Sequence, residues 1–158
     1  MNQDTTIMTN KFLTFVLATE EYAIDILRVQ EIKGWSKTTA IPNTPDYICG
    51  VINLRGTIVP IIDLRLRFGL EHLEYGQMTV VVVVKVVSSS RERIMGIVVD
   101  AVSDVYDITE QDIKPPPEFG TVINIEFVKG LVGVGDKMVI VLDIDRLLNS
   151  AELAIADS

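Results

Sequence analysis

The sequence predicts an all-β protein built from two small, similar β units. Most apolar segments are short and rich in Val and Ile, they are bounded by Gly, Pro, Asn or Asp, and one pair of them recurs later in the chain. With 158 residues, of which 48% are hydrophobic, the chain can bury a substantial core. We expect strands over residues 11–18, 22–27, 48–54, 57–64, 78–87, 93–100, 129–134 and 137–144.

The first two expected strands form an opening hairpin, because residues 11–18 alternate in character and Glu20 and Glu21 then lead into the next strand. The most apolar strand, over residues 78–87, should be buried on both faces. Helical signal is confined to single turns, which we expect over residues 64–68, 109–112 and 145–149.

An internal repeat is the most informative feature of the sequence. A glycine, two apolar strands and an aspartate occur from Gly50 to Asp63 and again, 80 residues later, from Gly130 to Asp143. Upstream, residues 24–32 match residues 97–105 at an offset of 73. Two matching blocks in the same order predict a single domain of two interleaved β subdomains, roughly residues 12–70 and 78–149. Each would close into a small barrel, with a groove at their junction.

Composition excludes several classes of protein. The chain carries 14 Lys and Arg against 22 Asp and Glu, a net charge of −8, which opposes binding to a phosphate backbone. It has one cysteine and one histidine, so we expect no disulfide framework and no metal cage. The N-terminus lacks a secretory signal, and the longest apolar run is about half the ~20 residues that a membrane helix needs. We therefore expect a cytoplasmic protein without direct membrane insertion.

No credible active site emerges from the reactive side chains. His72 lies among acids in an expected loop, and Cys49 begins an apolar strand, where burial would raise the pKa of its thiol. Asp63 and Asp143 occupy equivalent strand ends and should cap the turns that follow. We expect no catalytic residue, cofactor or metal. A barrel enzyme would need a pair of carboxyl groups with perturbed pKa values. A nucleic-acid-binding barrel would need a basic stripe that contains aromatic residues.

Two features are open to a binding role. Arg55 interrupts two apolar strands at a tight turn, where it is either a solvated turn residue or a multi-donor contact for a partner's carboxylates or carbonyls. Ile26, Val29 and Ile32 recur at helix-like intervals around Glu31, so they are either core residues or an exposed apolar interface.

The ordered set of motifs closely resembles the CheW family, the coupling proteins of bacterial chemotaxis. The resemblance covers residues 12–149 and rests on EYAIDILRVQEI (21–32), NTP (43–45), GVINLRG (50–56), IVPIIDL (58–64), GIVVD (96–100) and VSDV (102–105). It implies two SH3-like five-stranded β-barrels related by a pseudo-twofold axis. It also implies a non-catalytic adaptor that couples the cytoplasmic tips of methyl-accepting chemoreceptors to the regulatory domain of the histidine kinase CheA. Such a protein is cytoplasmic and is recruited to membrane-bound receptor arrays.

Carried onto this sequence, the family's sites fall at three places. The receptor-binding signature falls on Asn53, Leu54, Arg55 and Gly56. The kinase-binding apolar patch, expected to be exposed, falls on Leu13, Ile26, Val29 and Ile32, with Glu31 at its rim. A second kinase contact, which closes rings of kinase and adaptor, falls on Lys114, Glu118 and Phe119.

One departure from the family pattern is residues 88–93, which we expect to form a longer surface loop. A coupling paralogue that serves another signalling array remains an alternative to a chemotaxis role.

Overall fold

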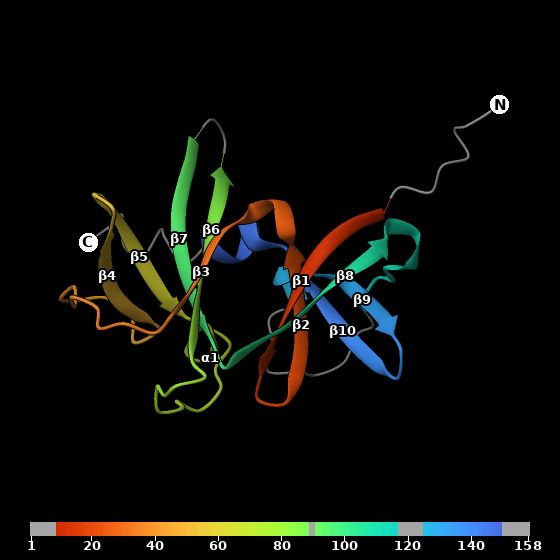
Figure 1. Cartoon of the computed structure of the whole chain (residues 1–158), viewed down its shortest axis with the longest axis horizontal. Helices are drawn as coiled ribbons and strands as arrows, with labels where there is room; N and C mark the ends of the chain where they lie inside the picture. Colours follow the sequence, from red (N-terminus) through yellow and green to blue (C-terminus); the bar gives the residue numbers. More distant parts are fainter. Residues whose placement is uncertain (1–8, 89–90, 117–124, 150–158) are drawn as a thin grey trace.

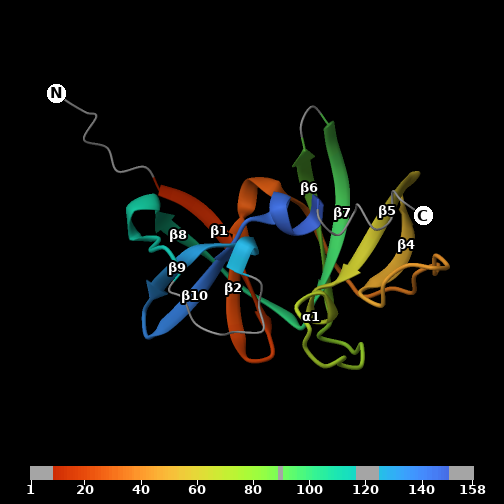
Figure 2. The same cartoon turned by 180° about the vertical axis from the view of Figure 1, so that it is seen from behind.

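The computed structural model describes residues 9–88, 91–116 and 125–149, and they form two five-stranded sheets that lie side by side (Figures 1 and 2). The predicted all-β class is confirmed. Sheet A has the order β8-β1-β2-β10-β9, and sheet B has the order β3-β6-β7-β5-β4. Sheet A contains β1 (Thr9–Leu17), β2 (Glu20–Asp25), β8 (Ala101–Thr109), β9 (Val128–Val134) and β10 (Lys137–Leu142). Sheet B contains β3 (Val29–Gly34), β4 (Ile48–Leu54), β5 (Thr57–Asp63), β6 (Val80–Ser88) and β7 (Arg91–Val99).

The helical pieces are short, as the sequence predicts. They are η2 (Ile26–Arg28), α1 (Leu64–Arg67), η3 (Glu110–Asp112), η4 (Ile125–Phe127) and the helical residues 144–149. The Asp63 carboxylate accepts from Leu66 N at 3.3 Å and that of Asp143 from Arg146 N at 3.1 Å, so the predicted capping role of both aspartates is confirmed.

The two sheets are related by the internal repeat. When strands β1–β5 are laid on β6–β10, the order of sheet B becomes the order of sheet A. Each sheet therefore takes the first two strands of one repeat and the last three of the other. Neither sheet is formed by one continuous range of the chain, because the chain crosses between the sheets at η2 and again at Asp100.

Two glycines of the repeat permit a close approach of the chain. Single antiparallel bridges join Thr39 to Val51 and Lys114 to Leu131, so the segment after each edge strand returns to the opposite edge of the same sheet. A Cβ atom on Gly50 would lie 2.2 Å from the Thr39 carbonyl oxygen, and one on Gly130 would lie 2.5 Å from that of Lys114. Any side chain at these positions would break the contact.

Strands β3 and β8 are absent from the predicted set. Both lie at a sheet edge, where one face meets solvent and polar residues alternate with apolar ones, so neither shows a continuous apolar run. The expected loop over residues 88–93 is also wrong in extent. Ser88 pairs with Arg91, so Ser88 and residues 91–93 belong to the strands of the hairpin.

The largest apolar cluster lies between the two sheets. Its central side chains are at most 1% exposed. They are Phe15 and Tyr22 of sheet A and Ile62, Val84 and Met95 of sheet B. Two smaller clusters fill the other faces, one in sheet A around Val139 and one in sheet B around Val59. The shared cluster buries apolar surface only when the sheets pack together, which ties their stability to each other.

Residues 70–78 are held against sheet B by a polar and aromatic contact. The Tyr75 hydroxyl donates to Asp63 Oδ2 at 2.6 Å and lies 3.4 Å from Cys49 Sγ. The Tyr75 ring packs on that of Trp35, with ring centroids 4.0 Å apart. The contact therefore joins this segment to the ends of β3 and β5.

Candidate interaction surface

Arg55 and Gly56 form the two-residue turn between β4 and β5. Leu54 pairs with Thr57, and the φ angles of the two turn residues are 50° and 91°. Two positive φ values in succession are typical of a type I′ turn, whose twist matches that of the flanking strands. The Asn53 side chain stabilises the turn, because its Oδ1 accepts a hydrogen bond from Gly56 N at 2.8 Å.

Arg55 combines an uncommon backbone conformation with an exposed charge. Gly, Asn and Asp adopt positive φ more easily than an arginine, so the local backbone alone would favour another residue at this position. Ala18 and Thr19 also adopt positive φ in the turn between β1 and β2, so the conformation marks a tight turn, and the charge of Arg55 is what distinguishes it. The turn also holds the Arg55 side chain 73% exposed, with guanidinium donors available to a partner.

An ion pair joins Arg55 to β3. Its Nη2 atom lies 2.6 Å from Glu31 Oε1. The hydrogen bond from Arg55 lowers the pKa of Glu31, and the same bond raises the pKa of Arg55. The pair therefore brings together a residue of the predicted receptor signature and a residue at the rim of the predicted kinase patch, which are 24 positions apart.

A pocket of about 250 Å³ lies beside this ion pair. It opens at the end of sheet B, and both residues of the ion pair contribute to its wall. Its lining residues are Gln30, Glu31, Leu54, Arg55, Thr57, Val59, Val83 and Ile94. The lining thus combines the two charged side chains with apolar ones, of which Val59 and Val83 are fully buried.

Ile58 adds an apolar side chain next to the turn. It is 60% exposed and faces the same side of β5 as Ile62, which is buried between the sheets. The apolar surface between the sheets therefore continues to the hairpin tip. The alternation of β5 in the sequence could have identified Ile58, because it lies four residues before a buried isoleucine on the same face.

The predicted kinase patch is only partly exposed. Ile32 is 44% exposed, whereas Ile26 and Val29 are half-buried and pack against the core between the sheets. The expected exposure of Leu13 is wrong. Leu13 is 2% exposed because β1 lies inside sheet A, between β2 and β8, and turns this side chain into the shared core.

Leu27 is an exposed apolar residue that the sequence analysis missed. It is 76% exposed and lies in η2, between Ile26 and Arg28. The signal was present in Asp25, whose Oδ1 accepts from Leu27 N at 2.9 Å and starts the 3₁₀ turn. An aspartate at this point indicates a turn, and a turn projects Leu27 outward where a continuing strand would not.

The predicted second contact is described only at Lys114. This residue is exposed, and its backbone bridges to Leu131. Glu118 and Phe119 lie outside the described residues.

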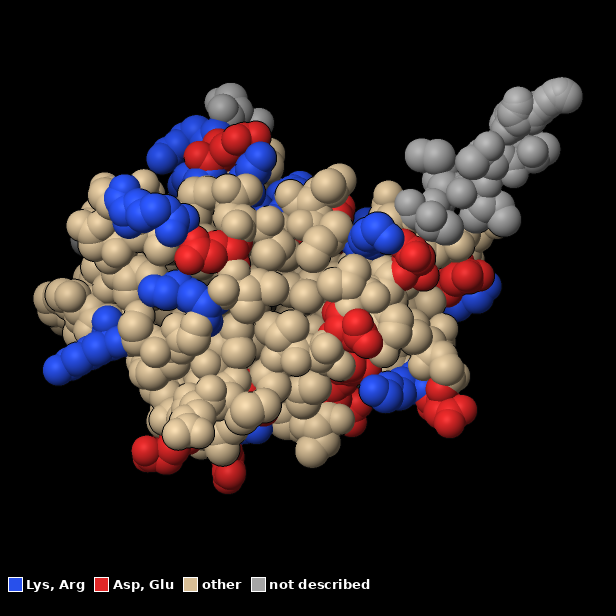
Figure 3. Space-filling model, in the orientation of Figure 1, with Lys and Arg blue, Asp and Glu red and all other residues tan. Residues whose placement is uncertain are grey.

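Cys49, the single cysteine of the chain, lies partly buried at the second position of β4. Burial raises the pKa of Cys49 to about 11, which confirms the predicted direction and makes the thiol a weak nucleophile at neutral pH. Within residues 9–88, 91–116 and 125–149, no group of three His, Cys, Asp or Glu side chains is arranged to hold a metal ion. On the face in Figure 3, Lys and Arg are interspersed with Asp and Glu and form no basic stripe.

In the part of the chain that the structure describes, no helix combines the length and the apolar character needed to span a bilayer.

Comparisons with known proteins give a consistent result. The family model of the CheW-like domain matches residues 11–152. The chain is 49% identical over 148 residues to the chemotaxis protein CheW of Klebsiella aerogenes, covering 94% of this chain and 87% of the relative. It is 32% identical to the chemotaxis protein CheW of Bacillus subtilis, covering 93% of each. The crystal structure of the scaffolding protein TtCheW from Thermoanaerobacter tengcongensis superposes with a TM-score of 0.80 at 37% identity, covering 93% of this chain and 92% of that one. The chain belongs to the CheW-like domain family.

Proposed function

We propose that this protein couples the cytoplasmic tips of chemoreceptors to a CheA-type histidine kinase, with Arg55 as the central receptor contact. The single observation that carries the proposal is the exposed guanidinium of Arg55. The backbone of Arg55 lies in a hairpin turn with positive φ, and its side chain forms an ion pair with Glu31. Family membership supports a coupling role in chemotaxis. An arginine of this kind can bind carboxylates or carbonyls of a receptor hairpin with several donors at once.

The apolar surface around η2 and β3 supplies the proposed kinase contact. Leu27 and Ile32 are exposed there, and Glu31 lies at its edge, in contact with Arg55. Receptor and kinase would then bind neighbouring parts of one surface. Lys114, Glu118 and Phe119 remain the proposed second kinase contact, through which adaptor and kinase alternate in rings. Several modest contacts of this kind act together in an array at the membrane.

An adaptor of this kind acts by position. By placing the kinase beside the receptor tip, it allows a change in the receptor to alter kinase activity, which requires both partners to be bound together. No bond of a substrate is made or broken by the adaptor itself.

A co-sedimentation assay tests the proposal. The protein is mixed with receptor cytoplasmic fragments and with the kinase, separately and together, while kinase phosphorylation is followed. We expect a ternary complex with receptor-dependent phosphorylation. Binding to neither partner, with a folded protein, would overturn the proposal.

A charge exchange separates direct contact by Arg55 from a merely structural role of its ion pair. The variant that combines Glu31→Arg with Arg55→Glu keeps an ion pair between the two strands but reverses its polarity. If Arg55 touches the receptor, this variant loses receptor binding as fully as Arg55→Glu does. Normal receptor binding by the exchanged variant would show that only the ion pair matters.

A further inference from the structure

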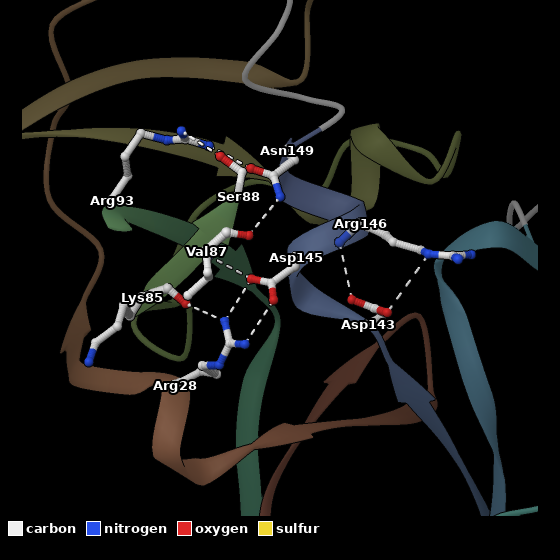
Figure 4. Close-up of polar contacts among 9 residues, drawn as sticks. All are labelled: Arg28, Lys85, Val87, Ser88, Arg93, Asp143, Asp145, Arg146 and Asn149. Carbon is white, nitrogen blue, oxygen red and sulfur yellow. Dashed lines mark hydrogen bonds and ion pairs between the residues drawn. The ribbon is translucent and has the colours of Figure 1, made fainter. Parts of the chain in front are cut away.

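Two bidentate ion pairs occupy equivalent places in the two repeats. In the first, which we call the α1 pair, Arg65 Nε and Nη2 lie 2.7 and 2.8 Å from the two carboxylate oxygens of Asp100. In the second, the C-terminal pair, Arg28 Nη1 and Nη2 lie 2.6 and 2.8 Å from those of Asp145 (Figure 4). Both are well shielded, with side chains 16–17% exposed in the α1 pair and 28% exposed in the C-terminal pair.

Each pair links the helical turn after one sheet to a point where the chain crosses between the sheets. Arg65 and Asp145 both lie two residues after a capping aspartate, Asp63 in one repeat and Asp143 in the other. Their partners occupy the two crossings: Asp100 between β7 and β8, and Arg28 at the end of η2.

The equivalence extends to the backbone. The carboxylate of the α1 pair accepts from Ala18 N at 2.9 Å, and that of the C-terminal pair accepts from Val87 N at 2.8 Å. These two amides lie three residues beyond Phe15 and Val84, which pair across their hairpins with Tyr22 and Met95. Guanidinium, carboxylate and amide thus form the same arrangement twice.

The polarity is opposite in the two pairs, and the crossing residues are one position out of register, because at the offset of 73 residues Asp100 aligns with Leu27 and Arg28 with Ala101. The α1 pair has its arginine on the helical turn and its aspartate at the crossing, whereas the C-terminal pair has them reversed. Because each sheet combines strands of both repeats, two identical repeats from different copies could in principle combine in the same way. In that arrangement α1 would bring Arg65 against Arg28, or the C-terminal turn would bring Asp145 against Asp100.

We propose that the opposite polarity of the two ion pairs directs each repeat to combine with the other repeat and prevents like repeats from combining between copies of the chain. Two shielded like charges at bidentate distance repel strongly and lose their hydrogen-bond partners. The correct combination satisfies all four charges. A scaffold that depends on exchanged strands thereby distinguishes its two halves by charge.

Four full-length proteins test this inference by refolding from denaturant at several concentrations. They are the parent, the variant with Arg28→Asp and Asp145→Arg, the variant with Arg65→Asp and Asp100→Arg, and the variant with all four changes. Each variant keeps two pairs of opposite charge in the correct fold, but an exchanged pair turns a guanidinium toward the backbone amide, of Ala18 or of Val87, that donates to the carboxylate in the parent. Exchange of one pair gives both the same polarity, whereas exchange of both restores opposite polarity, so the fourfold variant is the matched control.

We expect either single exchange to raise the ratio of oligomer to monomer after refolding about tenfold, as size-exclusion chromatography measures it, which corresponds to ~1.4 kcal/mol. The fourfold variant should return to the parent's ratio of oligomer to monomer, although its free energy of unfolding should fall because the amides of Ala18 and Val87 lose their carboxylate acceptors. Equal ratios in all four proteins would overturn the inference. A fourfold variant that refolds no better than the single exchanges would also overturn it, because the surroundings of each pair would then dictate its polarity.

Discussion

The β4–β5 and β9–β10 hairpins hold equivalent places in the two sheets, yet only the first carries a charged side chain suited to recognition at the first position of its turn. At an offset of 80 residues, Gly133 stands where the first hairpin has Asn53, and Gly135 stands where it has Arg55. Gly135 adopts a φ of 60° at no steric cost, whereas Arg55 adopts 50° against its preference. The second turn position also differs, because Gly56 has a φ of 91° whereas Asp136 has no positive φ, so the two turns are of different type and the first turn presents a charged side chain at a position where the second has none.

Both hairpins carry an exposed apolar side chain at the equivalent position. Ile58 is 60% exposed and Met138, its equivalent, is 58% exposed. The hairpins therefore share an apolar surface and differ in charge, which assigns specificity to Arg55 and its partner Glu31.

Charge reversal at the first hairpin should have the largest effect. Arg55→Glu removes the donor and sets two carboxylates against each other, so we expect receptor binding to fall by about 30-fold or more, as for an interface hot spot. Co-sedimentation with receptor fragments measures the loss. Asp136→Lys, a charge reversal in the turn of the second hairpin, is the matched control and should bind normally. Equal losses in both variants would contradict the comparison.

The kinase contact can be compared between the sheets in the same way. Ile32 and Val105 are equivalent residues of β3 and β8, 44% and 45% exposed. Ile32→Asp should weaken kinase binding about tenfold, because an aspartate would be desolvated in an apolar contact. Val105→Asp should have a smaller effect in a binary titration with the kinase. A larger loss from Val105→Asp would move the contact to sheet A.

Ile32 is a better site for this substitution than Val29, because Ile32 is more exposed. Val29 lies half-buried against the core, so an aspartate there would also destabilise the fold, and a loss of kinase binding could not be assigned to the interface.

Acid should weaken both ion pairs. Burial by itself raises the pKa of Asp100 and of Asp145, but hydrogen bonds from arginine and from a backbone amide outweigh it, and both pKa values fall below normal. A lowered folded-state pKa adds stability above the unfolded value of about 3.9, and this stability is lost as the pH falls through the folded value.

Denaturant unfolding between about pH 2 and 6 measures this effect. Asp100→Asn and Asp145→Asn should each flatten the pH dependence of the free energy of unfolding. An unchanged slope in either variant would show that its ion pair adds no stability.

The smallest effect is expected from a graft. Gly135→Arg places an arginine at the second hairpin, where no heavy atom lies within 4 Å of a Cβ added at this position. It should lower the melting temperature slightly, because positive φ disfavours arginine. In the Arg55→Glu background it should not restore receptor binding, since the groups around Arg55 are absent. Restored binding would show that an exposed arginine on either hairpin suffices.

Much of this architecture could be predicted from the sequence, because the strong signals are local. The structure confirms the capping role predicted for the two repeated aspartates. It also confirms the strands predicted from continuous apolar runs. Strands β3 and β8 were missed because their sequences, VQEIKG and AVSDVYDIT, mix polar and apolar residues and contain no continuous apolar run. The contact of Glu31 with Arg55 and the burial of Leu13 could not be read from spacing, since both depend on which strands become neighbours.

The stacking of Trp35 on Tyr75 makes the two halves of the molecule distinguishable by spectroscopy. Trp35 is the single tryptophan of the chain and it packs against sheet B, so its fluorescence reports the half that carries Arg55. The far-ultraviolet circular dichroism signal comes from the strands of both sheets. If the exchanged strands make the molecule one cooperative unit, the two signals will follow the same unfolding curve, whereas a separate opening of sheet A would precede any change in emission.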